Sequence, residues 1–391
     1  MSWIRTTTIA LSCALAAGAL GLWFGGHPEH LPKPLRNAFV DDDRALRAEV
    51  IHSIESNYLH KVSGAKLKEA SLKGIVQSLH DRFSHYLSPK EATLLEQRIS
   101  GQFEGVGMTV DQDKRGLRVQ NVFDGTPAKK AGITEGDVIT AVNGKSIAGV
   151  SSEVATGRIK GPSGTKVRLQ VLEPGRKSPR SVTVTRKAIE VPVARGRVVR
   201  RGGRKLGVVQ LVSFSSGAHG LLRKEIDKVR RKGADALVLD LRGNGGGLLE
   251  EAVLVSSIFV EDGKVVSVRG RTRPEHSESA QGNAIARNLP LVVLVDRGSA
   301  SASEIVTGAL RDRGRATVVG TRTFGKGLVQ EVQPLSNGGV LDLTVARYYL
   351  PKGETISTKG IQPQVKAEDK PKTRPDEALN KALDTLLQKS R

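Results

Sequence analysis

The chain has 391 residues, of which 38% are hydrophobic and 4% aromatic. This length predicts two or three domains with enough chain to bury a core, and the composition excludes a wholly disordered protein. The formal net charge of +21 favours contact with an anionic surface such as nucleic acid, acidic lipid or cell wall. The single cysteine, Cys13, excludes an internal disulfide, a cysteine-based metal site and a cysteine nucleophile in the folded body.

Residues 1–26 have the pattern of an export signal, either a cleaved signal peptide or a signal anchor. Arg5 is followed by an apolar run from Ile9 to Phe24, which is long for a cleaved signal and short for a full membrane span. We therefore expect an exported protein, either periplasmic or anchored to the inner membrane with its body on the periplasmic side.

Residues 27–98 are predicted to form an N-terminal helical region. Apolar residues recur every three to four positions between residues 45 and 58 and again between 66 and 79. A third helix is expected to begin at Pro89, because proline is favoured at the first helical position.

Residues 99–188 are predicted to form a small β-domain. Alternating segments separated by glycine-rich turns predict strands, and they lie at residues 117–123, 137–143, 166–172 and 180–186. The strings GVGM (105–108), GTPAKKAG (125–132) and EGDVITAVNG (135–144) resemble a PDZ domain. The resemblance implies that a substrate C-terminus adds a strand to the domain. The backbone N–H groups implied to hold its carboxylate are those of Gly105, Val106, Gly107 and Met108.

Residues 176–205 carry eleven lysines and arginines against one acidic residue, Glu190. Valine and isoleucine alternate with these charges, which predicts a solvated strand face with a basic turn. No aromatic residues are interleaved for base stacking, so nucleic acid is not expected as a partner.

Residues 189–363 are predicted to form an α/β core, and residues 364–391 a charged linker and a short C-terminal helix. Apolar strands without alternation are separated by helical segments from Lys205 onward. Such strands imply a sheet that is covered on both faces.

The segment GTRTFGKG, residues 320–327, reads as a phosphate-binding loop that lacks its last residue. Gly327 supplies no hydroxyl for Mg²⁺, and the following residues alternate like a strand instead of opening a helix. Nucleotide binding is therefore not favoured. Lys326 is instead a candidate general base, a role that requires burial to lower the pKa of the lysine.

The segment GSASASE, residues 298–304, joins a buried strand to a helix. Ser301 and Glu304 fit a capping box, which needs no chemistry. A serine at such a junction is also a candidate nucleophile, because the helix N-terminus and the N–H of Ala302 would stabilise an oxyanion. The glycine-rich loop at residues 240–247 could supply a second N–H group, although it also fits an ordinary turn between strand and helix.

Four motifs follow one another along the chain: DLRGNGGG, VDRGSASASEIVTGAL, VVGTRTFGKGLVQ and LDLTVARYYLPKGETISTKGIQP. In sequence and in order they resemble those of the C-terminal processing peptidases, also called tail-specific proteases. Members of this family are serine endopeptidases with a Ser–Lys pair and an embedded PDZ domain. Together with the PDZ strings, the resemblance spans about residues 45–363. It implies a multidomain α+β fold, with a helical region, a PDZ domain, a ClpP/crotonase-like α/β core with β additions, and a short C-terminal helix.

The resemblance also implies the site residues. Ser301 would be the nucleophile, Lys326 the general base and Gln330 its support, with oxyanion donors at the N–H groups of Gly247 and Ala302. The implied acyl transfer needs no metal or cofactor. Gly243 stands where the family often has Asn, which predicts a looser loop.

Three other functions compete with this interpretation: a histidine-based serine protease with a PDZ domain, a catalytically silent PDZ scaffold, and a structural envelope protein. The expected partners are proteins with accessible C-termini, an adaptor or activator, and an anionic envelope surface. Residues 41–60 and 376–388 are candidate segments for homo-oligomerisation, and ordinary packing onto the core is the alternative.

Overall fold

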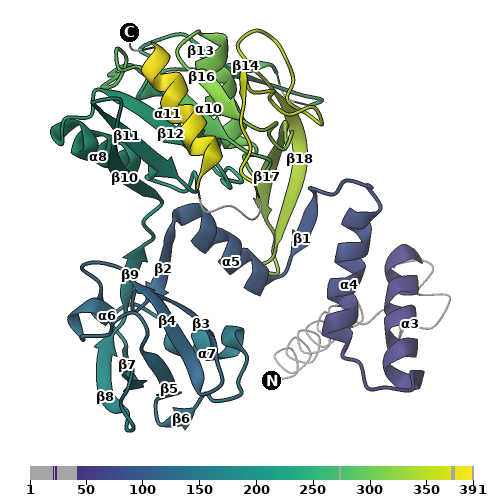
Figure 1. Ribbon diagram of the computed structural model, residues 1–391. Coiled ribbons are helices and arrows are strands. Elements are labelled where there is room, and N and C mark those ends of the chain that lie inside the picture. The colour runs from purple at the N-terminus through teal and green to yellow at the C-terminus, as the bar shows by residue number, and fades with distance from the viewer. Residues whose placement is uncertain (1–20, 22, 24–41, 273, 371–374, 390–391) are drawn as a thin grey trace, which may run out of the picture. The chain divides into compact units, whose positions relative to one another are not determined.

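The computed structural model describes residues 21, 23, 42–272, 274–370 and 375–389 (Figure 1). Of the expected export segment, only Gly21 and Trp23 fall within these residues. No helix among them is long and apolar enough to cross a membrane. The chain divides into two compact units, and residues 332–343 of a long hairpin belong to the first unit.

Besides the hairpin residues, the described part of the first unit includes two helices and a short strand. The helices are α3 (Asp42–Asn57) and α4 (Gly64–Gln77), and the strand is β1 (His85–Leu87). Both helices were predicted from the spacing of apolar residues and are confirmed. The strand β1 was not predicted, because its three residues are extended only through antiparallel pairing with the distant residues 340–342.

The β-domain of the second unit confirms all four predicted strands. Its sheet has the order β3-β4-β5-β7-β8, with the short β6 (Lys145–Ser146) paired to β5. The strands are β3 (Met108–Asp113), β4 (Gly116–Val122), β5 (Val138–Val142), β7 (Lys166–Leu172) and β8 (Arg180–Thr185), and the helices are α6 (Pro127–Lys130) and α7 (Ser152–Ile159). Among the described strands, β3 pairs with β4 alone, so β3 forms an edge of the sheet.

The chain segments that lead into and out of the β-domain lie side by side. Helix α5 (Pro89–Ser100) begins at the predicted proline and is followed by β2 (Gln102–Gly105). Strand β2 pairs antiparallel with β9 (Lys187–Glu190), which leaves the domain. The β-domain is therefore inserted in the chain between two paired connecting strands.

The core of the second unit is a sheet with the order β10-β11-β12-β15-β16-β19. β10 and β11 form an antiparallel hairpin, and the pairs from β11 to β19 are parallel. The strands are β10 (Ala194–Arg201), β11 (Arg204–Leu211), β12 (Ala236–Asp240), β15 (Leu291–Val295), β16 (Thr317–Gly320) and β19 (Val365–Lys366).

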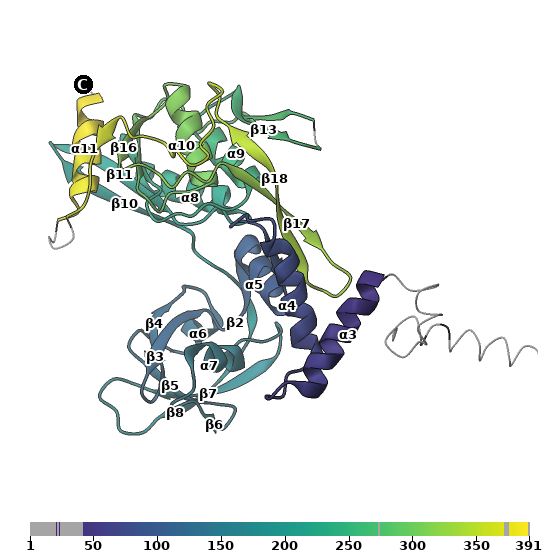
Figure 2. The ribbon, with the colours of Figure 1, turned by 90° about the vertical axis from the view of Figure 1, so that its right-hand side faces the viewer.

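Helices cover both faces of this sheet, as the apolar strands predicted. Helices α8 (Ala218–Arg231), α9 (Leu249–Ser257) and α10 (Ala302–Asp312) share one hydrophobic cluster, while α11 (Glu377–Lys389) closes a second cluster on the other face. Figure 2 shows α11 on one side of the sheet and α9 and α10 on the other. In β12, Leu237 and Leu239 enter the first cluster and Val238 the second, which explains why the strand is continuously apolar.

Strands β1, β13, β14, β17 and β18 form a second sheet. Strands β17 (Leu328–Pro334) and β18 (Val340–Tyr349) follow the alternation seen after Lys326. Strands β13 (Lys264–Gly270) and β14 (His276–Ser279) were not predicted, and β13 pairs with the far end of β18.

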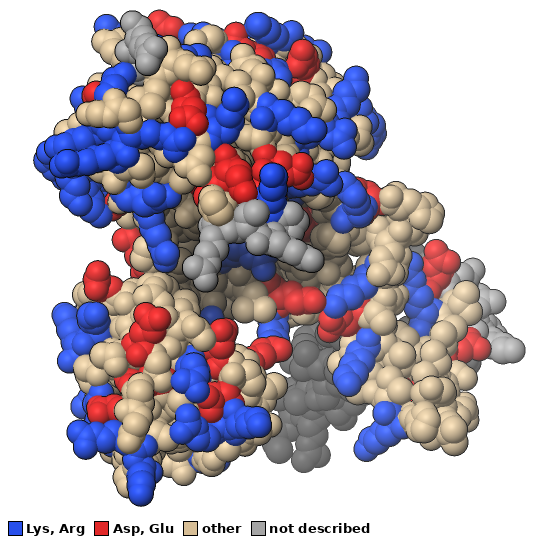
Figure 3. Space-filling model, in the orientation of Figure 1, with Lys and Arg blue, Asp and Glu red and all other residues tan. Residues whose placement is uncertain are grey.

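The basic segment, residues 176–205, forms strands with a solvated face, which confirms the prediction. It covers β8, β9, β10 and the start of β11, with a turn at Gly202 and Gly203, which both have positive φ. Arg195, Arg197 and Arg200 are exposed on β10. Figure 3 shows basic side chains gathered over α8 and the β10–β11 hairpin.

The C-terminal helix α11 packs on the core sheet. Its buried apolar side chains are Ala378, Leu379, Ala382, Leu383 and Leu386. These side chains cover apolar residues of β11, β12, β15 and β16. Packing onto the core, the alternative to an oligomerisation segment, thus accounts for the apolar face of this helix.

We predict that Leu383→Ala destabilises the core. Leu383 is 2% exposed, and truncation of a buried leucine lowers the free energy of unfolding by about 2–5 kcal/mol. Lys381→Ala on the exposed face of the same helix should change it by no more than about 0.5 kcal/mol. Urea denaturation followed by circular dichroism measures both, and equal midpoints for the two variants would contradict the packing role of α11.

Candidate functional site

The three loops that carry the predicted site follow neighbouring parallel strands. Residues 241–247 follow β12, residues 296–301 follow β15, and residues 321–326 follow β16. The carboxyl ends of parallel strands meet at one edge of a sheet, where α/β proteins bind their ligands. The fold therefore brings these three sequence motifs together.

Ser301 occupies a strained turn between β15 and α10. Its φ is 55° and its ψ is −114°, a left-handed conformation that is uncommon for residues other than glycine. The residue is 8% exposed and directly precedes the first helical residue, Ala302. Strained turns of this kind present nucleophilic serines at the start of a helix.

Glu304 links the turn of Ser301 to the loop of Lys326. Its carboxylate is completely buried in the first turn of α10. Oε2 accepts hydrogen bonds from the backbone N–H of Ser301 and from that of Lys326, both at 2.9 Å. Oε1 accepts the N–H of Gly325 at 2.8 Å and the hydroxyl of Thr323. The predicted capping residue therefore also fixes the lysine loop against the serine.

Lys326 is half-buried between two glycines that pack closely against residues 356–360. A Cβ atom on Gly325 would lie 3.0 Å from the backbone nitrogen of Gly360, and one on Gly327 would lie 2.5 Å from that of Ser357. A side chain at either position would push the lysine loop away. Strand β17 follows the loop where a nucleotide site would have a helix, which confirms the strand predicted after Lys326.

Gln330 lies on β17 and is half-buried. Its side-chain Nε2 donates a hydrogen bond of 3.3 Å to Oγ1 of Thr344 on β18. The neighbouring strand therefore orients this amide four residues beyond Lys326.

The glycine-rich loop packs directly on the turn of Ser301. A Cβ atom on Gly246, which has a φ of +101°, would lie 2.9 Å from Cβ of Ser301 and 3.0 Å from the nitrogen of Ala302. The carbonyl oxygen of Asn244 accepts the N–H of Ala300 at 3.0 Å and the hydroxyl of Ser303 at 2.8 Å. Glycine is required at position 246 because the two backbones meet there.

Two backbone donors beside Ser301 remain available for a ligand. The N–H of Gly246 donates to the side chain of Asn244, at 2.9 Å. Among the hydrogen bonds between described residues, none uses the N–H of Gly247 or that of Ala302. An N–H at a helix start with no internal partner readily donates a hydrogen bond to an anionic oxygen.

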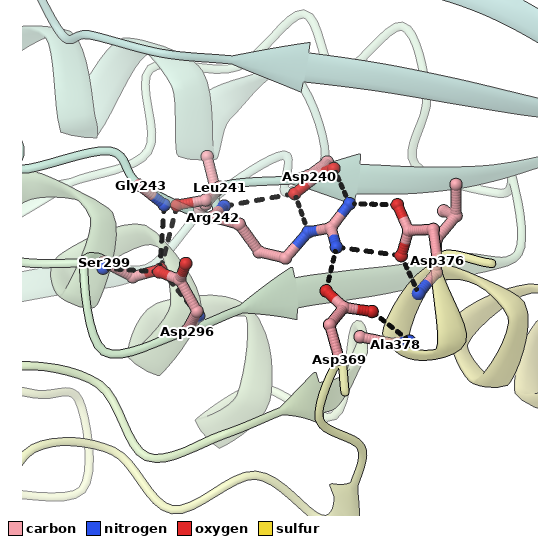
Figure 4. Close-up of polar contacts among 10 residues, drawn as sticks. Asp240, Leu241, Arg242, Gly243, Asp296, Ser299, Asp369, Asp376 and Ala378 are labelled. Atoms are coloured by element: carbon pink, nitrogen blue, oxygen red, sulfur yellow. Dashed lines mark hydrogen bonds and ion pairs between the residues drawn. The ribbon is translucent and has the colours of Figure 1, made fainter. Parts of the chain in front are cut away.

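Arg242 fastens the glycine-rich loop to the C-terminal segment, as Figure 4 shows. Its guanidinium contacts Asp240 at 2.8 Å, Asp376 at 2.9 Å and Asp369 at 3.0 Å. Burial opposes its charge, but hydrogen bonds to Asp240 and Asp376 and their negative charges raise the pKa of Arg242 above its usual value. The same loop is held from the other side, where the N–H of Gly243 donates to Asp296 at 2.9 Å.

The predicted carboxylate loop of the β-domain precedes the edge strand β3. Its carbonyl groups are occupied, since Val106 accepts the N–H of Ala128 and Gly107 accepts the N–H of Phe123. The N–H groups of Val106 and Gly107 take part in none of the hydrogen bonds described within the structured residues. Gly105 ends β2 and Met108 begins β3, so the loop leads directly into the sheet edge.

The sequence patterns did not identify Asn244 and Thr323, which support the turn of Ser301 and the carboxylate of Glu304. They indicated Glu304 only as a helix-capping residue. One signal in the sequence could have indicated the wider role of Glu304. Its carboxylate begins the apolar helix segment EIVTGAL, and a carboxylate buried there requires several hydrogen-bond donors. The donors come from a loop about twenty residues further along the chain, which no local pattern reveals.

Comparison with known proteins gives two family matches. The PDZ domain model matches residues 93–172, and the model of peptidase family S41 matches residues 205–367. The carboxy-terminal processing protease CtpA of Bacillus subtilis (strain 168) is 35% identical over 362 residues, which are 92% of this chain and 76% of that protein. A carboxy-terminal-processing protease of Bartonella bacilliformis is 35% identical over 325 residues, 82% of this chain and 74% of that protein.

A solved structure supports the fold. The putative S41 protease from Bacteroides fragilis NCTC 9343 covers 86% of this chain and 92% of its own, with a TM-score of 0.51 and 21% sequence identity. The predicted fold class and the predicted resemblance are confirmed. The chain belongs to the carboxy-terminal processing proteases of peptidase family S41 and carries their PDZ domain.

Proposed function

We propose that this protease cleaves near the C-termini of exported proteins, with Ser301 as nucleophile and Lys326 as general base. The observation that carries this assignment is the shared carboxylate of Glu304, which accepts the backbone N–H of both residues on one oxygen. Gln330, oriented by Thr344, supports the lysine.

The proposed reaction is an acyl transfer. Neutral Lys326 takes the proton of the Ser301 hydroxyl while Oγ attacks the peptide carbonyl. The N–H groups of Gly247 and Ala302 receive the oxyanion, and one such donor is worth about 3 kcal/mol in the transition state. Lys326 then protonates the leaving amine, and water releases the acyl group from Ser301. The N-terminus of α10 adds its positive end to the same oxyanion site.

We also propose that the PDZ domain holds the substrate tail. An extended tail would pair with the free edge of β3. Its carboxylate would accept backbone N–H groups of the loop formed by Gly105, Val106, Gly107 and Met108. The occupied carbonyls and available N–H groups of Val106 and Gly107 support this orientation.

We propose export to the periplasm, either free or anchored to the inner membrane. The support is the pattern of residues 1–26, which lies outside the described residues except at positions 21 and 23. The exposed cations over α8 and β10 support contact with an anionic envelope surface.

Assembly and activation are part of the proposal. Helix α3, in the segment 41–60, exposes Leu46 and Val50, and Tyr58 follows it, also exposed. Such a surface supports binding to a second copy or to an adaptor. In 376–388 the apolar face of α11 is buried, so only its polar face remains for assembly.

We predict that Ser301→Ala and Lys326→Ala each lower the cleavage rate at least about 10⁴-fold, because nucleophile and base act as a unit. The full chain would be incubated near pH 8 with an unstructured protein that ends in an apolar tail, and the fragments would be identified by mass spectrometry. Binding of the tail by all variants, with cleavage by none, would instead favour a silent PDZ scaffold.

His219→Ala is the control that separates a histidine mechanism from the lysine mechanism. Nδ1 of His219 contacts the buried carboxylate of Glu251 at 2.9 Å, which makes it the histidine best placed to act as a base in a triad. We expect His219→Ala to cleave at the wild-type rate. Loss of cleavage in His219→Ala but not in Lys326→Ala would overturn the assignment.

We predict that Glu304→Gln lowers kcat about 10²-fold with a smaller effect on KM. A glutamine oxygen can accept only part of the bonds that the carboxylate accepts from Ser301, Gly325 and Lys326, so the lysine loop shifts relative to the serine. Glu250→Gln, on the exposed start of α9, is the matched control and should behave as wild type. A change in KM alone would argue against this positioning role.

We predict that Gly107→Ala weakens binding of a tail peptide at least about tenfold. A Cβ atom there would lie 2.4 Å from Cβ of Thr126, so the carboxylate loop must move. Gly149 also has a positive φ, of +71°, so Gly149→Ala strains the backbone too, but nothing lies within 4 Å of its Cβ. Fluorescence anisotropy with a labelled tail peptide compares them, and equal affinities would contradict the loop's role.

A further inference from the structure

A cavity of about 550 Å³ opens on the surface of the α/β core, beside the lysine loop. Three basic side chains line it, those of Arg297, Arg322 and Lys366, together with Thr323 and Phe324. Its volume falls in the range of sites that bind small molecules or peptide side chains. Neither Ser301 nor Lys326 lines it, so it is distinct from the catalytic pair.

The cavity opens at the same edge of the sheet as the catalytic loops. Arg297 follows β15, Arg322 follows β16, and Lys366 ends β19. The N–H of Phe324 donates to the carbonyl of Ser299 at 3.0 Å, which joins the two loops next to the cavity. Ser301 lies two residues after Ser299, and Lys326 lies two residues after Phe324. A peptide held at Ser301 would therefore extend past this cavity within a few residues.

The charge of the cavity favours an anion. Among the described residues, no carboxylate forms an ion pair with Arg297, Arg322 or Lys366, whereas Arg242 contacts three. Glu368 is the acidic residue of the lining. Three cations and one carboxylate leave an excess of positive charge, which favours an anionic ligand.

We propose that this cavity binds a carboxylate of the peptide substrate, so that the protease prefers tails with an acidic group a few residues from the scissile bond. The inference rests on the proposed function, because it takes Ser301 as the point of cleavage. Arginine suits this role since its planar guanidinium holds a carboxylate with two parallel hydrogen bonds. The carboxylate comes from an aspartate or glutamate side chain or from the C-terminus of a short tail.

Binding to the full-length Ser301→Ala variant tests the proposal without catalysis. The probes are peptides in which one glutamine at a time is replaced by glutamate, each made with a free and with an amidated C-terminus. We expect one position at which glutamate binds about three- to tenfold more tightly than glutamine in the amidated series, less so at high salt. A gain confined to free C-termini, and lost on substituting the cavity arginines, would identify the terminal carboxylate as the source.

The double variant Arg297→Gln/Arg322→Gln, made in the Ser301→Ala chain, identifies the cavity. It should bring the ratio of glutamate to glutamine affinity to about one. Arg200→Gln, an exposed arginine on β10 outside the cavity, is the control and should keep the ratio. A preference that survives the double variant would overturn the proposal.

The same peptides incubated with the wild-type chain separate this proposal from the proposed function. Cleavage with equal binding of glutamate, glutamine, free and amidated peptides overturns the carboxylate site and leaves the protease assignment intact. A preference that depends on the cavity arginines, in a chain that cleaves none of the peptides, supports the site and contradicts the catalytic assignment. Preference in both binding and cleavage supports both.

Discussion

The site depends on one buried carboxylate. Glu304 has no solvent contact, and a carboxylate in that environment is tolerated only when donors surround it. Its four hydrogen bonds come from the turn of Ser301 at one end of α10 and from residues 323–326 after β16. The cost of burying the charge therefore fixes two separate loops against each other. The placement of the proposed nucleophile and of the proposed base follows from a requirement of folding.

The strained conformation of Ser301 persists because its surroundings hold it from several sides. Gly246 presses the glycine-rich loop against its Cβ, and the carbonyl of Asn244 binds the residues on either side of the turn. Strained backbone of this kind is maintained only where the neighbouring structure over-determines it. The same contacts leave the N–H groups of Gly247 and Ala302 without an acceptor among the described residues, so the rigidity of the turn and the proposed oxyanion site have one origin.

The sequence predicted most of the fold because local patterns determined it. Strands such as β7 and β12 were visible from alternation or from continuous apolar character, and α5 from the proline at its start. The short strand β1 and the pair β13 and β14 were not visible, because their extended backbone depends on distant partners. Of the site, the motifs indicated Ser301 and Lys326, but the bonds of Glu304 to residues 323–326 join segments that only the folded sheet brings together.

The C-terminal helix takes part in both the core and the site, which limits what its removal can reveal. Deleting residues 376–391 would expose the apolar residues of β11 and β12 that α11 covers and would also remove Asp376 from Arg242. Arg242 lies in the loop that carries Gly247, so a truncated chain would lose stability and loop position together, whatever its oligomeric state. A role of α11 in assembly is therefore separable only through its exposed side chains, such as Lys381, which contribute to neither the hydrophobic cluster nor the contacts of Arg242.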